Sequence, residues 1–376
     1  MKQEHLYAVA LTRLGGFNLP ALMELYQRAG SATAIYEHRN NIHDILPDAT
    51  QRLVETLENW DNVISFAERE LQYDEQNNIE VLCLNDENYP QRLRECPDAP
   101  IVLYKQGNVN LNKHRTLNII GTRNCTQYGR DLIRAFIREL KLICPDALVF
   151  SGLAYGIDIC AHRESLANNM ETVGVVAHGL DIVYPRMHTG TAKEMCEKGG
   201  GVITEYTTNT QPVPKNFVQR NRIVAGCTDA TLLVESANKG GGLITCNIAR
   251  SYNREVFAFP GAIGAEYSEG CNQLIRDNGA SLITSAYDFV KAMNWDNDIK
   301  LEKAQQQGIE RTLFPNLNSE EQTVVEALQQ QNDQQINMLS VRTNLSMARL
   351  MALLFELEMK GIIRTMAGGC YHLLEV

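Results

Sequence analysis

The sequence predicts an α/β protein built on a Rossmann-like, doubly wound and mostly parallel sheet, with a small helical domain before it and a winged helix after it. The main observation is that short, β-rich apolar runs alternate with helical segments over residues 79–295. Near-continuous apolar strands of this kind are typical of a parallel sheet covered by helices on both faces. The other two observations are the helical periodicity of residues 1–78 and the three helices and hairpin of residues 316–376.

Residues 1–78 are predicted to form the helical domain. The segment LPALMELYQRAG spaces its apolar residues along one helix face and ends at Gly30, and a longer helical pattern follows in TQRLVETLENWDNVISFAERELQ. The stretch LTRLGGFNLPALMEL is similar to a helix-hairpin-helix or SAM-like fold. Residues 1–80 nevertheless carry 6 Lys/Arg against 13 Asp/Glu, a net of −7. This acidic balance favours packing over DNA binding for the domain.

Residues 79–295 are predicted to carry the functional site. In an open parallel sheet, ligands bind beyond the carboxyl ends of the strands, so the residues that follow each strand are the first candidates. The expected strands are EVLCL, IVLYKQG, LNIIGTR, LVFSGLA, TVGVVAHGL, GVITEY, TLLVES, EVFAFPG and ASLITSA.

Small residues follow several of these strands and predict a phosphate-binding rim. Glycines there let an anion approach the backbone N–H groups at the positive end of a helix. A single such glycine is more often a turn residue, whereas several at one sheet edge favour a binding rim. The candidates are Ser151, Gly152, Gly156, Gly179, Gly241, Gly242 and Thr245, with the last of the helices expected to begin near Thr245.

The stretch KNFVQRNRIVAG, which begins at Lys215, surrounds an aromatic side chain with cations in a chain of net charge −10. As a helix it places Lys215 and Arg222 on one face, Arg220 on a neighbouring side, and Phe217 among them. Cations hold phosphates and an aromatic ring stacks on a base, so the pattern is typical of a surface for single-stranded nucleic acid. The alternative is that Phe217 is a core residue and Arg220 pairs with a carboxylate such as Glu205.

Local charge agrees with an anionic ligand in the middle of the chain. Residues 215–254 carry 6 Lys/Arg against 2 Asp/Glu, and residues 113–165 carry 8 against 5, so these segments are basic by +4 and +3. An electropositive face on an acidic body steers anions toward it. The bland alternative is that these cations lie on solvated helix faces, paired with nearby acids.

Several classes of protein are disfavoured by what the sequence lacks. It has no GxGxxG dinucleotide fingerprint and no GxxxxGK[ST] phosphate loop. Its ten cysteines form no CxxC pair and no Cys/His cluster at ligand spacing, so we expect neither metal nor cofactor, and reduced thiols in a cytoplasmic protein. No apolar run is long enough for a membrane span. Asp158 and His162, four residues apart, are the one acid–base pair considered, and packing is favoured over catalysis for them.

The C-terminal part is predicted to be a linker, residues 296–315, followed by a winged helix, residues 316–376. The winged helix carries 4 Lys/Arg against 7 Asp/Glu, whereas a module that reads duplex DNA is usually basic. We therefore expect an accessory or protein-contact module. The recognition helix is expected to be largely core, through Met347, Leu350, Met351 and Leu354.

The chain resembles the bacterial DNA-processing protein A family, also called DprA or Smf. The resemblance covers nearly the whole chain and rests on motifs in family order, with two departures. Val218 stands where the family usually has proline, and Gly240-Gly241-Gly242 replaces a Ser-Gly-Ser. The motifs are NYPQRLRECPDAPIVLYKQGN, IIGTR…YGR, SGLAYGIDICAH, HGLDIVYP, RNRIVAG, EVFAFPG and GCNQLIRDNGA.

The resemblance implies a non-enzymatic recombination mediator. Such proteins bind single-stranded DNA through the sheet domain, form homodimers, and help load the RecA recombinase on DNA taken up in natural transformation. The DNA contacts carried over to this chain are Arg123, Lys215, Phe217, Arg220 and Arg222.

The alternative class is an enzyme. The architecture also resembles nucleotide-binding phosphoribohydrolases of the lysine-decarboxylase-like group, but GGGLITCNI lacks the glutamate of their PGGxGTxxE loop. A small nucleotide bound as a regulatory ligand is a third possibility that the sequence leaves open.

Overall fold

The computed structural model describes residues 2–14, 19–296, 299, 317–360, 362–366 and 369–373. The chain divides into two compact units, Met1–Asp296 and Asn297–Val376. The predicted linker lies almost wholly outside the described residues. The predicted boundary after residue 78 falls inside the first unit, where the first helix packs against both the fifth helix and the first strand.

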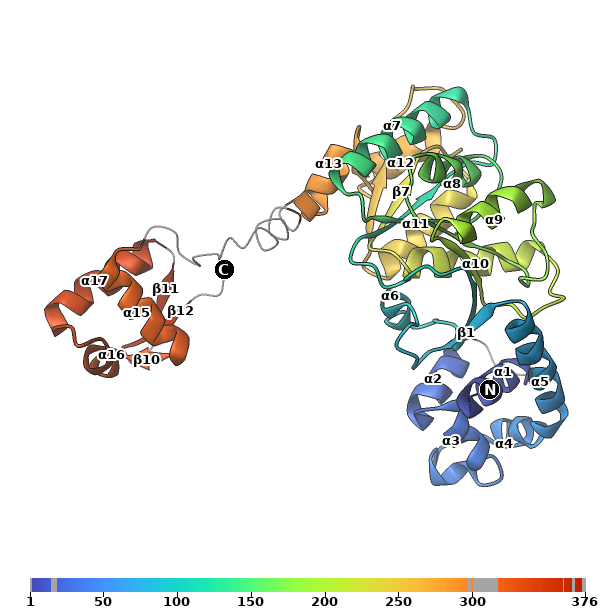
Figure 1. The fold of residues 1–376 in the computed structure, drawn as a ribbon, viewed down its shortest axis with the longest axis horizontal. Helices are drawn as coiled ribbons and strands as arrows, with labels where there is room; N and C mark the ends of the chain where they lie inside the picture. The colour runs from blue at the N-terminus through green and yellow to red at the C-terminus, as the bar shows by residue number, and fades with distance from the viewer. Residues whose placement is uncertain are drawn as a thin grey trace. The chain divides into compact units, whose positions relative to one another are not determined.

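Helices precede the sheet, as predicted (Figure 1). Their core forms around α1, whose residues from Tyr7 to Leu11 are buried, and Trp60 packs edge-on against the rings of Tyr7 and Tyr36. The glycine turn of the helix-hairpin-helix prediction lies outside the described residues. The elements are α1 (Gln3–Arg13), α2 (Leu19–Ala29), α3 (Ala32–Glu37), η1 (Ile42–Asp44), α4 (Gln51–Glu58) and α5 (Asp61–Gln76).

A nine-stranded sheet forms the centre of the first unit, and every predicted run contributes one strand to it. The order is β1-β2-β6-β5-β4-β3-β7-β8-β9. The β1–β2 and β2–β6 pairs are antiparallel and all the others are parallel. The strands are β1 (Ile79–Cys83), β2 (Val102–Gln106), β3 (Thr116–Ile120), β4 (Leu148–Ser151), β5 (Thr172–Val175), β6 (Gly201–Thr204), β7 (Ala230–Leu233), β8 (Glu255–Ala258) and β9 (Ser281–Leu282).

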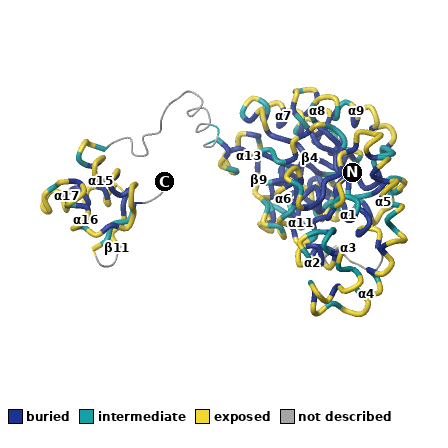
Figure 2. The backbone as a smooth tube through the Cα atoms, turned by 60° about the horizontal axis from the view of Figure 1, so that its bottom comes forward, coloured by how far each residue is buried: buried dark blue, intermediate teal, exposed yellow. Residues whose placement is uncertain are grey.

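Helices cover the sheet in two layers. On one side α7 packs against α13 and α8, and α8 against α9, while α10 and α11 pack together in the other layer (Figure 1). Figure 2 shows the central strand β4 as buried and the outer helical turns as exposed. The helices are α6 (Gln91–Arg94), α7 (Gln127–Ile143), α8 (Ile157–Ala167), η2 (Arg186–His188), α9 (Thr189–Glu197), α10 (Pro214–Gly226), α11 (Gly241–Ser251), α12 (Glu269–Arg276) and α13 (Ala286–Ala292).

The strand order confirms the doubly wound prediction and locates the switch point of the sheet. From β3 the chain proceeds through β4, β5 and β6 on one side, then returns through α10 to β7 on the other side. Ligands of open α/β sheets bind in the crevice outside the strand ends at such a point. The β3 and β7 ends therefore define where a site is expected.

The second unit is a winged helix, as predicted. Its strands form an antiparallel sheet in the order β10-β12-β11, and the side chain of Asn318 caps the first helix in a capping box with Glu321. The elements are α15 (Ser319–Gln330), β10 (Gln334–Gln335), α16 (Ile336–Thr343), α17 (Met347–Met359), β11 (Ile363–Met366) and β12 (Cys370–Leu373).

The prediction for the core of α17 is half wrong. Leu350 and Leu354 are buried, but Met347 and Met351 are 39% and 57% exposed. The helix is apolar on more than one face, so its periodicity alone does not tell which stripe packs on α15. The exposed stripe continues with Phe355.

No helix in the described ranges is both long and apolar enough to cross a membrane.

One buried carboxylate in α5 has no partner. Asp74 is 2% exposed, and neither of its oxygens has a hydrogen-bond partner in the described part of the chain. Burial, and then repulsion by Glu70, raises the pKa of Asp74 to about 8. Glu70 itself accepts hydrogen bonds of 2.6 Å from the backbone and hydroxyl of Thr208. The folded state therefore favours a neutral Asp74.

We expect Asp74→Asn to stabilise the protein at neutral and mildly alkaline pH. A carboxyl with a raised folded pKa contributes stability that is present below its unfolded pKa of 3.8 and is lost as pH rises toward about 8. The amide never ionises, so the free energy of unfolding should rise by about 1–3 kcal/mol near the upper limit of this window, and by less at acid pH. Urea unfolding at several pH values measures this gain.

The exposed neighbour Glu75 provides the control, since Glu75→Gln removes a charge without changing a buried group. A loss of stability in Asp74→Asn above neutral pH, or a gain that does not depend on pH, would contradict the assignment of a neutral buried carboxyl.

Candidate functional site

A cavity of about 340 Å³ lies at the switch point, beyond the carboxyl ends of β3 and β7. Its wall is built from the loop after β3, the start of α8, the middle of α10 and the start of α11. Of the residues predicted for the site, Arg123, Phe217, Arg220, Gly241, Gly242 and Thr245 line this cavity.

Arg220 lies at the base of the cavity and is 4% exposed. Its Nη1 donates to the carbonyl oxygen of Gly152 at 2.6 Å and to that of Val175. These carbonyls stand at the ends of β4 and β5, so the side chain of one α10 residue ties two neighbouring strand ends together. The Asp158 carboxylate, in the first turn of α8, accepts a hydrogen bond from the Gly152 N–H at 3.1 Å.

The Arg220 and Asp158 charges compensate each other in a buried setting. Burial lowers the pKa of Arg220 to about 10, and Asp158 opposes that shift. Burial likewise raises the pKa of Asp158, and Arg220 opposes it. Removing one charge would leave the other buried without compensation, which is costly.

Arg222 is also buried, and it bonds the carboxylate of Glu205 through Nη2. Burial raises the pKa of Glu205, and Arg222 opposes the shift. Arg222 does not line the cavity. The pairing with Glu205 that the sequence left open exists, but it belongs to Arg222 rather than to Arg220.

The prediction that α10 presents an exposed ridge of three cations is therefore wrong for two of them, which are buried. Arg220 and Arg222 face inward because strand-end carbonyls and Glu205 supply acceptors that a helical periodicity does not show. Lys215 is exposed in the first turn of α10, and Phe217 is half-buried. Only Lys215 remains as an exposed cation of that ridge.

The outer edge of the cavity carries an aromatic and cationic group, which we call the rim cluster: Arg123, Tyr184 and Phe217. The Arg123 guanidinium lies 5.4 Å from the centroid of the Phe217 ring, and the Tyr184 ring lies 5.8 Å from it at a tilt of 57°. Arg123 and Tyr184 are exposed. Tyr184 was missed by the sequence analysis, although HGLDIVYP places it in a loop after a strand.

Four of the predicted rim residues pack the fold and do not line the cavity: Ser151, Gly152, Gly156 and Gly179. The Ser151 hydroxyl is buried and donates to the Ile119 carbonyl at 2.6 Å. Gly156 has φ +78°, and a Cβ there would lie 2.2 Å from the Thr122 carbonyl oxygen. A Cβ on Gly179 would lie 2.5 Å from the Thr207 carbonyl oxygen. The small size of these residues serves close packing, and the cavity lining gives no support to the phosphate-binding role predicted for them.

The start of α11 does face the cavity. Gly241 and Gly242 form its first residues, so the helix begins before Thr245, where the sequence placed its start. First-turn N–H groups have no partner within a helix and carry its positive dipole end. An anion in the cavity would meet these groups, while a planar group beside it would meet the rim cluster.

The acid and base considered for catalysis serve the fold, and so does the buried carboxylate of Glu235. Glu235 is buried and accepts hydrogen bonds from the Thr126 backbone and hydroxyl at the start of α7. His162 is fully buried, its Nδ1 lies 2.7 Å from the Thr172 hydroxyl, and burial lowers its pKa to about 3. The Asp158 carboxylate accepts a hydrogen bond from Gly152 and faces the charge of Arg220, so the Asp158–His162 pair is not arranged for proton transfer.

Two family models match the chain. Residues 80–294 match the model for DNA recombination-mediator protein A, and residues 312–369 match the DprA winged helix domain. The DNA processing protein DprA of Streptococcus pneumoniae is 36% identical over 208 residues, which cover 54% of this chain and 71% of that protein. Protein Smf of Escherichia coli is 34% identical over 221 residues, 59% of this chain and 58% of that protein.

Solved structures give the same relationship. The X-ray structure of DprA from Streptococcus pneumoniae superposes with a TM-score of 0.65 at 29% identity, covering 78% of this chain and 98% of that one. A second solved structure is that of DNA processing protein A from Helicobacter pylori, which concerns its single-stranded DNA binding mode. It superposes with a TM-score of 0.51 at 28% identity, covering 58% of this chain and 96% of that one.

Two glycine substitutions should separate a packing position from an open one. A Cβ at residue 152 would lie 2.6 Å from Asp158 Oδ2 and 2.7 Å from Arg220 Nη2, whereas a Cβ at residue 241 meets nothing within 4 Å. We expect Gly152→Ala to lower the free energy of unfolding by about 1–3 kcal/mol and Gly241→Ala to change it by about 0.5 kcal/mol or less. Equal urea midpoints for the two variants would contradict the buried charge arrangement around Gly152.

Proposed function

The chain belongs to the DNA recombination-mediator protein A family, and on that premise we propose that it binds single-stranded DNA at the cavity beyond β3 and β7 and helps load RecA recombinase onto it. In this proposal the protein acts in the cytoplasm as a homodimer, as a mediator rather than an enzyme, on DNA taken up in natural transformation.

The observation that carries the proposal is the rim cluster above an anion-binding helix start. A single strand offers unstacked bases and a flexible backbone together, and proteins bind it with aromatic rings for the bases and cations for the phosphates. Phe217 and Tyr184 supply the rings, Arg123 and Lys215 the cations, and the start of α11 the backbone N–H groups.

The same arrangement favours single strands over duplexes. In a duplex the base faces are stacked on each other, so Phe217 and Tyr184 would find only edges and phosphates. Val218, which stands where the family usually has proline, is 52% exposed and adds apolar surface beside the cavity. The three glycines from residue 240 remove hydroxyls but leave the helix start accessible.

The winged helix supports a contact with protein rather than with duplex DNA. It is acidic, and α17 exposes Met351 and Phe355 on one face. Acidic surface repels phosphates, and exposed apolar stripes on a helix are typical of protein interaction sites. We assign this unit an accessory role in assembly, with its partner left open.

DNA binding is tested by fluorescence anisotropy with oligo-dT and a duplex of equal length across a salt series. We expect the wild type to prefer the single strand, and Phe217→Leu to weaken binding by about 1–3 kcal/mol for each stacked base, which is roughly 5-fold to 150-fold. Arg123→Gln and Lys215→Gln should each lower the log–log salt slope by about 0.7, because each removes one phosphate contact.

Lys198→Gln is the matched control. Lys198 is exposed after α9, at the amino-terminal edge of the sheet, and pairs with Glu194 at 2.9 Å. The Lys198→Gln variant should bind single-stranded DNA as the wild type does. Arg220→Glu is unsuitable as a test, because a second carboxylate beside Asp158 would disrupt the fold. Unchanged binding by a Lys215→Gln, Phe217→Leu double variant would contradict the proposal, and release of free base from nucleoside monophosphates would favour the phosphoribohydrolase alternative.

Loading of RecA has its own test. We expect the wild type, added in substoichiometric amounts, to speed RecA filament assembly on labelled single-stranded DNA, and Phe217→Leu to lose this effect in proportion to its DNA affinity. A wild type that binds the strand yet leaves the assembly rate unchanged would keep the DNA-binding proposal and remove the loading role.

A further inference from the structure

We propose a zinc site at the junction of α1 and the edge of the sheet, formed by His5, Cys83 and Asp86. The ligand atoms of these three side chains all lie within 4.8 Å of one another. Cys83 ends the edge strand β1, Asp86 lies in the loop after it, and His5 comes from α1. The cavity described for DNA lies at β3 and β7, in the interior of the strand order, so the two sites are separate.

A closed turn holds Cys83 and Asp86 together. The Asp86 N–H donates to the Cys83 carbonyl at 2.8 Å, and the Cys83 N–H donates to Asp86 Oδ2 at 2.7 Å. Two residues separate these ligands, which is the spacing of paired ligands in many structural zinc sites. The site shows no CxxC pair and no Cys/His cluster in the sequence, because its second ligand is a carboxylate and its histidine lies far away in the chain.

His5 completes the group from the first turn of α1. Its Nε2 lies 2.9 Å from Asp86 Oδ2. Zinc bonds of about 2.0–2.3 Å in a tetrahedron place neighbouring ligand atoms about 3.3–3.8 Å apart. A small rotation of the Asp86 carboxylate therefore converts the hydrogen-bonded pair into two ligands of one ion.

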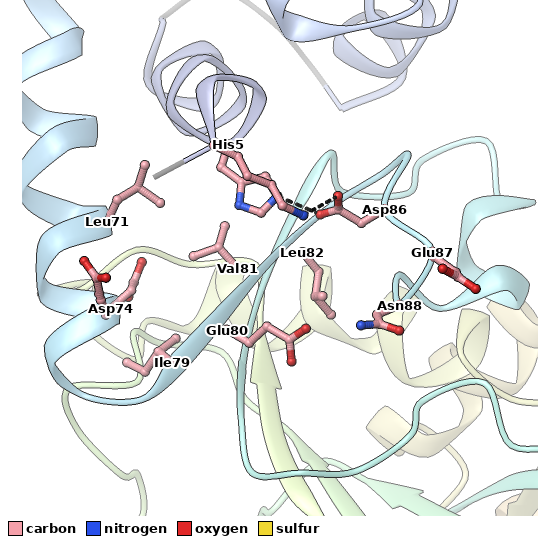
Figure 3. Close-up of a pocket in the computed structure, with 12 residues that line it drawn as sticks. His5, Leu71, Asp74, Ile79, Glu80, Val81, Leu82, Asp86, Glu87 and Asn88 are labelled. Carbon is pink, nitrogen blue, oxygen red and sulfur yellow. Dashed lines mark hydrogen bonds and ion pairs between the residues drawn. The ribbon is translucent and has the colours of Figure 1, made fainter.

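An acidic cavity of about 500 Å³ lies beside this group and is lined by His5 and Asp86, with Cys83 buried behind them. Figure 3 shows His5 and Asp86 turned toward each other at the cavity wall, joined by a dashed line. Besides the neutral Asp74, four carboxylates line this cavity, against one lysine, Lys2, and one histidine. Such a surface concentrates cations, and its open side leaves room for a water molecule as the fourth ligand.

The donor set selects zinc over other common divalent ions. One imidazole, one thiolate and one carboxylate suit Zn²⁺, whereas Mg²⁺ and Ca²⁺ prefer oxygen ligands. Cys83 would bind as the thiolate after its proton passes to water, so the two anionic ligands neutralise the two charges of the ion. Lys2, whose Nζ lies 3.8 Å from Asp86 Oδ1, is exposed and can turn away.

Zinc at this site would fasten the N-terminal helices to the sheet. His5 belongs to the helical region, while Cys83 and Asp86 belong to the sheet edge, and the His5–Asp86 contact is one of the links between them. A metal would add Cys83 to that link. The effect would be on stability and on the attachment of α1, with DNA binding unaltered.

Cobalt(II) titration of the chelator-treated full-length protein tests the site, because cobalt replaces zinc and a bound thiolate gives it a near-ultraviolet charge-transfer band. We expect the wild type to bind one equivalent with that band and with the visible bands of tetrahedral cobalt, to release cobalt on addition of zinc, and to melt at a higher temperature with either metal. Cys83→Ala should lose the charge-transfer band, and His5→Gln should weaken binding at least tenfold.

Two matched controls separate this site from casual metal binding. Cys96→Ala removes another buried thiol, and His43→Gln removes an exposed imidazole, and both should titrate as the wild type does. If Cys83→Ala does not fold, the loss of cobalt affinity in His5→Gln tests the site instead. A wild type without the charge-transfer band, or a band and affinity that survive in His5→Gln, would overturn the proposal.

Discussion

The buried guanidinium of Arg220 is the constraint on which the candidate DNA site depends. It donates from α10 to the carbonyls that end β4 and β5, and its charge faces Asp158 at the start of α8. Arg220 thereby fixes the ends of β4 and β5 to α10 and α8, which lie in opposite helical layers. The position admits only glycine at residue 152, where a Cβ would meet both charged groups.

This arrangement explains how an acidic protein presents a cationic site. The two arginines of α10 that are buried set the rotation of the helix, Arg220 through strand ends and Arg222 through Glu205. Buried ion pairs contribute little net stability, but they cost much when broken, so they define position well. With α10 held in this way, Phe217 lines the cavity, where the Arg123 guanidinium and the Tyr184 ring lie beside its ring.

The sheet could be predicted because its strands are buried on both faces and therefore appear as near-continuous apolar runs. The location of the site followed from topology, and the predicted residues Arg123, Phe217 and Gly241 do line one cavity. The burial of Arg220 could not be predicted, because its acceptors are backbone carbonyls that no residue type reveals. The group of His5, Cys83 and Asp86 could not be predicted either, because it joins segments that are distant in the sequence. The core face of α17 could not be predicted because the helix has two apolar stripes, and only tertiary packing determines which one is buried.

The most direct test of the account is whether a base of single-stranded DNA stacks at position 217. Phe217→Trp places a fluorophore there, and the two native tryptophans, Trp60 and Trp295, are 0% and 5% exposed and contribute a constant background. Titration with oligo-dT should quench the new fluorescence in step with anisotropy of the labelled strand. Binding of the strand with no change in that fluorescence would place the DNA elsewhere on the protein and contradict the account.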